Sequence, residues 1–156
     1  MKTVTRCKRN ARLSTIIDRP GGISVGVALK QASENLAPMK AKGLVIVSGL
    51  VTELEALPAP ATPGQTEARL EQTYRIGLAI LDAIGPFDLP YLQRAAWGLC
   101  DLSDRFVAGR PFDWRVVQVH TQALRLFLSS GPDTPAVAFD KVIEGLDKTV
   151  AHQRAG

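Results

Sequence analysis

The sequence predicts an all-α protein: a single-domain bundle of five or six helices with a mobile basic arm at its N-terminus. Its 156 residues suit one hydrophobic core. Apolar residues recur at helical spacing in several segments, and Pro- and Gly-rich linkers separate these segments. The β-branched run "LVIV" at 44–47 has no partner strand elsewhere, so it is assigned to a helix. We expect the arm to span 1–18 and the bundle 19–156.

The first helical stretch, 24–57, follows the turn "DRPGG", and Ser24 is its predicted N-cap. Pro38 lies inside it and predicts a kink or a break. Four further helix starts follow Pro-containing linkers, with predicted N-caps at Thr62, Asp88, Asp113 and Thr134. Thr62–Pro63–Gly64–Gln65 resembles a capping box with Pro at the first helical position. Apolar stripes then mark two of the helices: Leu70, Tyr74, Gly77, Leu81 and Ile84 in the first, and Phe139, Val142, Ile143, Leu146 and Val150 in the second.

The segment 113–129 contains His120, one of two histidines in the chain. On a helical wheel its polar residues share an arc of about 80°, and His120 lies in the broad apolar arc opposite. A phosphoacceptor histidine needs a solvent-facing ring, and the "HxxKG" pattern of histidine phosphotransfer domains is not matched here. Phosphotransfer through His120 therefore remains only a minor alternative to a buried, neutral, hydrogen-bonded imidazole with a lowered pKa.

The helix predicted within 89–107 carries the strongest indication of a binding surface. Its apolar arc comprises Leu92, Ala95, Leu99, Leu102 and Phe106. Trp97 falls in the middle of the opposite, polar arc, together with Arg94, Asp101 and Arg105. Exposed tryptophans beside charged residues are common anchors of protein interfaces. Alternatively, the linker "RPFDW" with Trp114 covers Trp97, or the Arg94 guanidinium stacks on its ring.

Basic residues are concentrated near the N-terminus, where residues 1–42 carry nine Lys and Arg against two acidic residues. The arm contributes Lys2, Arg6, Lys8, Arg9 and Arg12. Such an arm can bind nucleic acid, anionic lipid or an acidic protein face, or it is simply a solvated tail. The sequence has no helix-turn-helix with a basic recognition helix, so nucleic-acid binding is the second hypothesis rather than the first.

Motifs of catalysis and cofactor binding are absent from the sequence, including those for phosphate loops, dinucleotide folds, zinc proteases and serine hydrolases. Two histidines and the separated Cys7 and Cys100 do not form a metal-ligand pattern. We therefore expect no enzyme activity, no cofactor and no metal. No apolar run approaches the ~20 residues of a membrane span and no secretory signal is evident, so we expect a cytoplasmic protein without membrane insertion.

Two stretches, "NARLSTIIDRPGGISVGVALKQASENL" (10–36) and "WGLCDLSDRFVAGRPFDWRVVQVHTQALRLF" (97–127), resemble the CheE-type family of small accessory proteins. These proteins are encoded in chemotaxis gene clusters of some bacteria. The resemblance implies a non-catalytic adaptor in chemotaxis or motility signalling that contacts kinase, coupling or receiver components. It supplies no catalytic residue. Self-association is compatible with this role, and its stoichiometry does not follow from the sequence.

Overall fold

The computed structural model describes residues 21–104, 106, 111–130 and 135–155. Within these ranges the structure is all-helical, as predicted, with five α-helices. They are α2 (Val25–Ala56), α3 (Pro63–Ile84), α4 (Pro90–Asp104), α5 (Arg115–Ser129) and α6 (Ala136–Ala155). The predicted arm and the expected boundary at residues 18–19 lie outside the described residues.

The chain divides into two compact units, Met1–Asn35 and Leu36–Gly156. The described part of the first unit contains the turn at Gly21 and the beginning of α2. Ser24 caps this helix as predicted, since its Oγ accepts a hydrogen bond from the Val27 N–H at 3.4 Å. Helix α2 continues through Pro38, so the alternative of a break at this proline was wrong. The "LVIV" run is helical, as expected.

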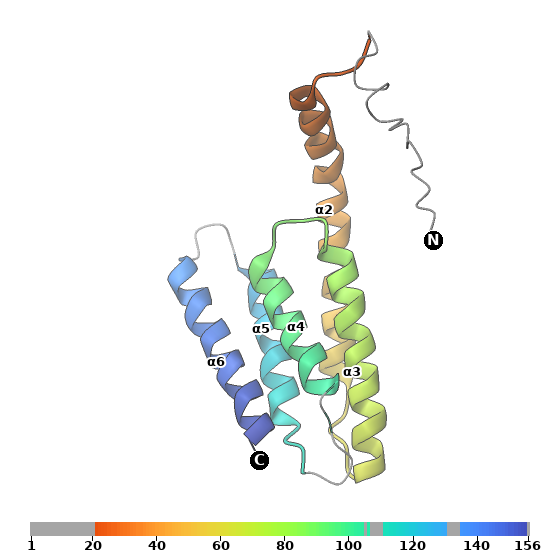
Figure 1. Ribbon diagram of the computed structural model, residues 1–156. Coiled ribbons are helices and arrows are strands. Elements are labelled where there is room, and N and C mark those ends of the chain that lie inside the picture. The colour runs from red at the N-terminus through yellow and green to blue at the C-terminus, as the bar shows by residue number, and fades with distance from the viewer. Residues whose placement is uncertain (1–20, 105, 107–110, 131–134, 156) are drawn as a thin grey trace, which may run out of the picture. The chain divides into compact units, whose positions relative to one another are not determined.

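The second unit is an antiparallel bundle in which α3, α4, α5 and α6 each run opposite to the preceding helix (Figure 1). Helix α4 packs against α3, α5 and α6. The C-terminal half of α2 packs on α3, where the Gly43 backbone lies close to the Ala83 carbonyl. All five helices contribute to one core, whose buried apolar residues are Val47, Val51, Leu54, Leu70, Ile76, Ile80, Ile84, Leu92, Ala95, Ala96, Leu99, Trp114, Val117, Ala123, Leu124, Phe127 and Leu146.

The N-terminus of α3 is a variant of the predicted capping box. The Gln65 N–H donates to Thr62 Oγ1 at 3.3 Å, and Pro63 is the first helical residue. The Gln65 side chain accepts from the Ala61 N–H at 2.9 Å, one residue before the N-cap. Two backbone donors at this helix end are thereby satisfied.

The remaining predicted caps had mixed outcomes. The N-cap of α4 is Leu89, one residue after the predicted Asp88, because the Leu89 carbonyl accepts the first hydrogen bond of the helix, from the Gln93 N–H. Asp113 accepts from the Arg115 N–H at 3.0 Å and from the Arg115 guanidinium, so it caps the start of α5 from one residue before Trp114. Thr134 lies outside the described residues.

Two helices show how closely the apolar arcs match the buried faces. In α6, Leu146 and Val150 are buried, and Phe139, Val142 and Ile143 pack against the core. In α5 the buried face is narrower than the predicted arc, because Val119 and Leu126 are 42% and 44% exposed. Val119 and Leu126 are seven residues apart and therefore lie on the same side of the helix, so α5 presents apolar side chains to solvent along one edge of its packed face.

Candidate interaction surface on helix α4

Trp97 is the most exposed large apolar side chain of α4, at 61%. Helix geometry explains this exposure, because the buried positions Leu92, Ala95, Ala96, Leu99 and Leu102 lie on the other side of the helix. Trp114 is itself buried in the core at 8% exposure and does not cover Trp97. A fully formed helix thus presents an indole ring to solvent, where burial in a partner would remove substantial apolar area from water.

An open hollow of about 520 Å³ surrounds Trp97 at the seam between α4 and α6. Its lining comprises Arg94, Trp97, Gly98 and Asp101 from α4 and Asp147 and Val150 from α6. The surface therefore combines an aromatic ring with charges of both signs. This composition is typical of the centre of a protein–protein interface with its polar rim.

Of the four residues predicted to bind a partner, three are described and lie together at this hollow. Arg94 donates from Nη2 to Asp147 Oδ2 at 2.9 Å, so it links α4 to α6. Both side chains are more than half exposed, and such a pair contributes only about 0–1 kcal/mol to stability. The pair can therefore open for a partner at small cost. Arg105 lies outside the described residues, as does the basic arm of Lys2, Arg6, Lys8, Arg9 and Arg12.

His120 lies directly beneath this surface and is fully buried. Its Nδ1 is 2.9 Å from the Val116 carbonyl, one turn earlier in α5. Its Nε2 points at Gly98 of α4, where a Cβ would be only 2.7 Å away, and has no hydrogen-bond partner among the described residues. Burial lowers the pKa of His120, although the Val116 carbonyl and the Asp147 charge oppose this effect.

The environment of His120 agrees with the predicted buried imidazole and disfavours the phosphotransfer alternative. The partner of Nδ1 is a carbonyl of its own helix rather than of a neighbouring one. A receiver domain could reach the ring only if α4 and α5 separated, because Gly98 of α4 packs directly on Nε2. The ring serves instead to fill the space between these two helices.

Cys100 is buried, and burial raises the pKa of its thiol to about 11, with a smaller contribution from the Asp104 charge. The thiol is therefore protonated at neutral pH and a poor nucleophile.

No group of three or more His, Cys, Asp or Glu side chains that could hold a metal ion occurs in the described ranges. In the same ranges, no helix has the length and apolarity needed to span a membrane.

Two further features were not predicted from the sequence. Arg125 of α5 binds three side chains of α2: its guanidinium donates twice to Glu55, at 2.9 and 2.7 Å, and also to Thr52 and Ser48. This interaction fixes α5 against α2, and it joins residues 70 positions apart, a separation that periodicity does not reveal.

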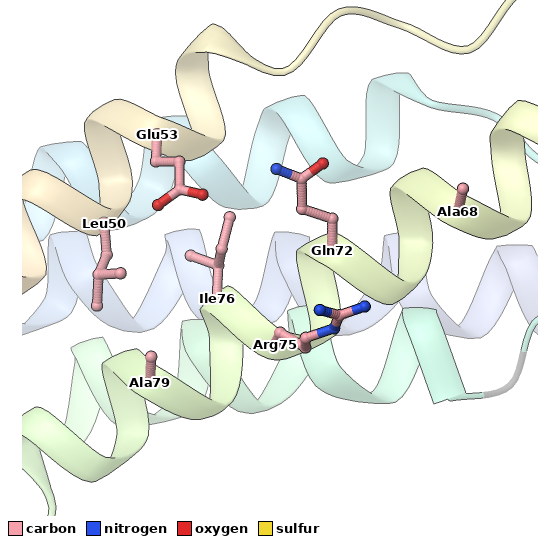
Figure 2. A pocket seen from close by; sticks show the side chains of 7 residues that line it. All are labelled: Leu50, Glu53, Ala68, Gln72, Arg75, Ile76 and Ala79. Atoms are coloured by element: carbon pink, nitrogen blue, oxygen red, sulfur yellow. The ribbon is translucent and has the colours of Figure 1, made fainter.

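The second unpredicted feature is a hollow of about 410 Å³ between α2 and α3. Figure 2 shows Leu50 and Glu53 projecting from α2 toward α3, and Gln72 and Ile76 projecting from α3 toward α2. Arg75 lies at the same hollow and forms a 2.7 Å ion pair with Glu71.

Comparison of the chain with protein-family models, curated proteins and solved structures finds no match.

Proposed function

We propose that this protein is a non-catalytic adaptor that binds another protein through the surface around Trp97. The observation that carries the proposal is the 61% exposure of Trp97 above a hollow formed by two packed helices. Because α4 is held in place by α3, α5 and α6, the backbone that carries Trp97 is already ordered and does not have to become ordered on binding.

Its partners are proposed to be chemotaxis signalling proteins, specifically a kinase, coupling or receiver component. This part rests on the resemblance of 10–36 and 97–127 to CheE-type proteins. An adaptor of this kind acts by binding one state of its partner more tightly than another, which shifts the partner's equilibrium. A cytoplasmic location belongs to the same proposal.

An affinity pull-down from native cytosol tests the proposal, with Trp97→Ala compared with wild type. Removing an aromatic anchor from the centre of an interface weakens binding by about 2 kcal/mol or more, roughly 30-fold. We expect a chemotaxis component to be captured by the wild type and lost with Trp97→Ala. Leu126→Ala is the matched control, because Leu126 is also an exposed apolar residue but lies on α5.

The proposal fails if the captured proteins are the same for Trp97→Ala and wild type. Capture of nucleic acid alone, abolished by deleting residues 1–12, would favour the basic arm as the functional element instead. The affinity for nucleic acid would then fall steeply with salt concentration, as is expected when lysines and arginines displace counterions from phosphates.

A further inference from the structure

Helix α2 has a second periodic face that the described part of the chain leaves exposed. The buried face comprises Gly43, Val47, Val51 and Leu54. Another set recurs at spacings of three and four residues and is exposed at every position: Met39, Lys42, Ile46, Gly49, Glu53 and Ala56. A repeat of this spacing forms the seam along which one helix packs against another in a coiled coil. We refer to these six residues as the α2 seam.

The α2 seam is self-complementary when two copies of the helix run antiparallel. Around a two-fold axis between residues 47 and 48, Met39 lies opposite Ala56, Lys42 opposite Glu53, and Ile46 opposite Gly49. Each layer thus joins a long side chain to a short one, or a cation to an anion. A two-fold interface requires this property, because each contact must occur twice with the roles exchanged.

No contact among the described residues accounts for a glycine at position 49 or an exposed isoleucine at position 46. A Cβ added at Gly49 would meet nothing within 4 Å, whereas one at Gly43 would lie 2.7 Å from the Ala83 carbonyl oxygen. A glycine in a helix interior costs stability relative to alanine, and Gly49 gains no close contact in return. Ile46 is 56% exposed. In the antiparallel pair, the Ile46 side chain fills the space left by Gly49 of the other copy.

The charges at the α2 seam also favour pairing with a second copy of this helix. Among the described residues, neither Lys42 nor Glu53 forms an ion pair. They are separated by about 16 Å along the helix axis, so they cannot pair with each other in one chain. Glu53 also lines the hollow between α2 and α3 (Figure 2). In the antiparallel pair, its carboxylate would be accessible to Lys42 of the second copy.

We propose that the protein forms a two-fold dimer in which α2 pairs antiparallel with α2 of a second copy along Met39–Ala56. The Lys42–Glu53 contacts set the register and direction, and the Ile46–Gly49 contacts bring the helices close together. This dimer leaves the Trp97 surface on α4 outside the pairing helices, so it is independent of the proposed adaptor function.

Sedimentation velocity of the full chain tests this dimer, over about 1 to 200 μM, where small interfaces dissociate. We expect the wild type to shift from monomer to dimer mass as concentration rises. Lys42→Glu and Glu53→Lys each place like charges opposite one another, so each should weaken dimerisation at least about tenfold. Both residues are exposed, so neither variant should disturb the fold, which far-UV circular dichroism can verify.

Mixing provides the decisive arm of the experiment. In an equimolar mixture of Lys42→Glu and Glu53→Lys chains, both charge contacts become favourable, so a heterodimer should form although each variant alone stays monomeric. The double variant should dimerise like the wild type. Lys141→Glu is the control, since it makes the same charge reversal on α6 and should dimerise normally. A monomeric wild type, dimeric single variants or a monomeric mixture would each overturn the proposal. A monomeric wild type would indicate that the α2 seam binds a different protein instead.

Discussion

Gly43→Leu is expected to lower the free energy of unfolding by about 3 kcal/mol or more. At this position α2 passes so close to α3 that a Cβ would lie 2.7 Å from the Ala83 carbonyl oxygen and 3.1 Å from the Phe87 ring. The nearer neighbour is backbone, which cannot rotate away as a flexible side chain can. The helices would have to separate, which would loosen the packing of Val47 and Val51 in the core.

Gly145→Leu is the matched control for this substitution. A Cβ at Gly145 meets nothing within 4 Å, and the residue is exposed on α6. Leucine has a higher helix propensity than glycine, so this variant should gain about 0.5–1 kcal/mol. Urea unfolding followed by circular dichroism measures both values. Equal effects of the two substitutions would show that α2 does not approach α3 closely at Gly43.

Acid should destabilise the fold through His120. The folded pKa of His120 lies below the unfolded value of 6.5, chiefly because burial penalises the imidazolium. The unfolded chain therefore binds this proton more readily than the folded chain. The contribution of His120 to the free energy of unfolding is fully present above its unfolded pKa of 6.5. It declines as the pH falls, by up to about 1.4 kcal/mol per pH unit, until the pH reaches the folded pKa.

The groups that face His120 come from three helices: the Val116 carbonyl of α5, Gly98 of α4, and the more distant Asp147 of α6. Only Asp147 carries a charge that favours the imidazolium, and Arg94 already engages it. Urea unfolding at pH 7.5, 6.5, 6.0 and 5.5, with His120→Gln for comparison, isolates the contribution of the ring. The variant should lose most of the decline between pH 6.5 and 5.5. An equally steep decline in the variant would assign the acid sensitivity to other groups.

Local features of the sequence predicted much of this fold. Amphipathic periodicity located the helices and the buried side of α4, and hence the exposure of Trp97. Side-chain chemistry within a few residues predicted the caps at Ser24 and Thr62. These interactions are short-range, so the pattern that encodes them lies within one or two helical turns.

The relations between helices could not be predicted in this way. Arg94 pairs with Asp147 and Arg125 pairs with Glu55, which lie 53 and 70 residues away, and no local pattern around either arginine indicates these partners. The packing of the whole core determines which helices are neighbours. Periodicity in the sequence shows which face of a helix is buried, but not which helix covers that face. The hollow around Trp97 was missed for the same reason, because α6 forms one of its sides.

The most direct test of the central claim is site-specific photocrosslinking in the native cell, with a photoreactive phenylalanine analogue in place of Trp97 or, separately, Leu126. Both positions are exposed, on α4 and α5 respectively. The adaptor account predicts discrete adducts at position 97 that mass spectrometry identifies as a chemotaxis kinase, coupling or receiver protein, and none of these at position 126. No adduct at position 97, or the same adducts at both positions, would contradict the claim that this surface binds a partner.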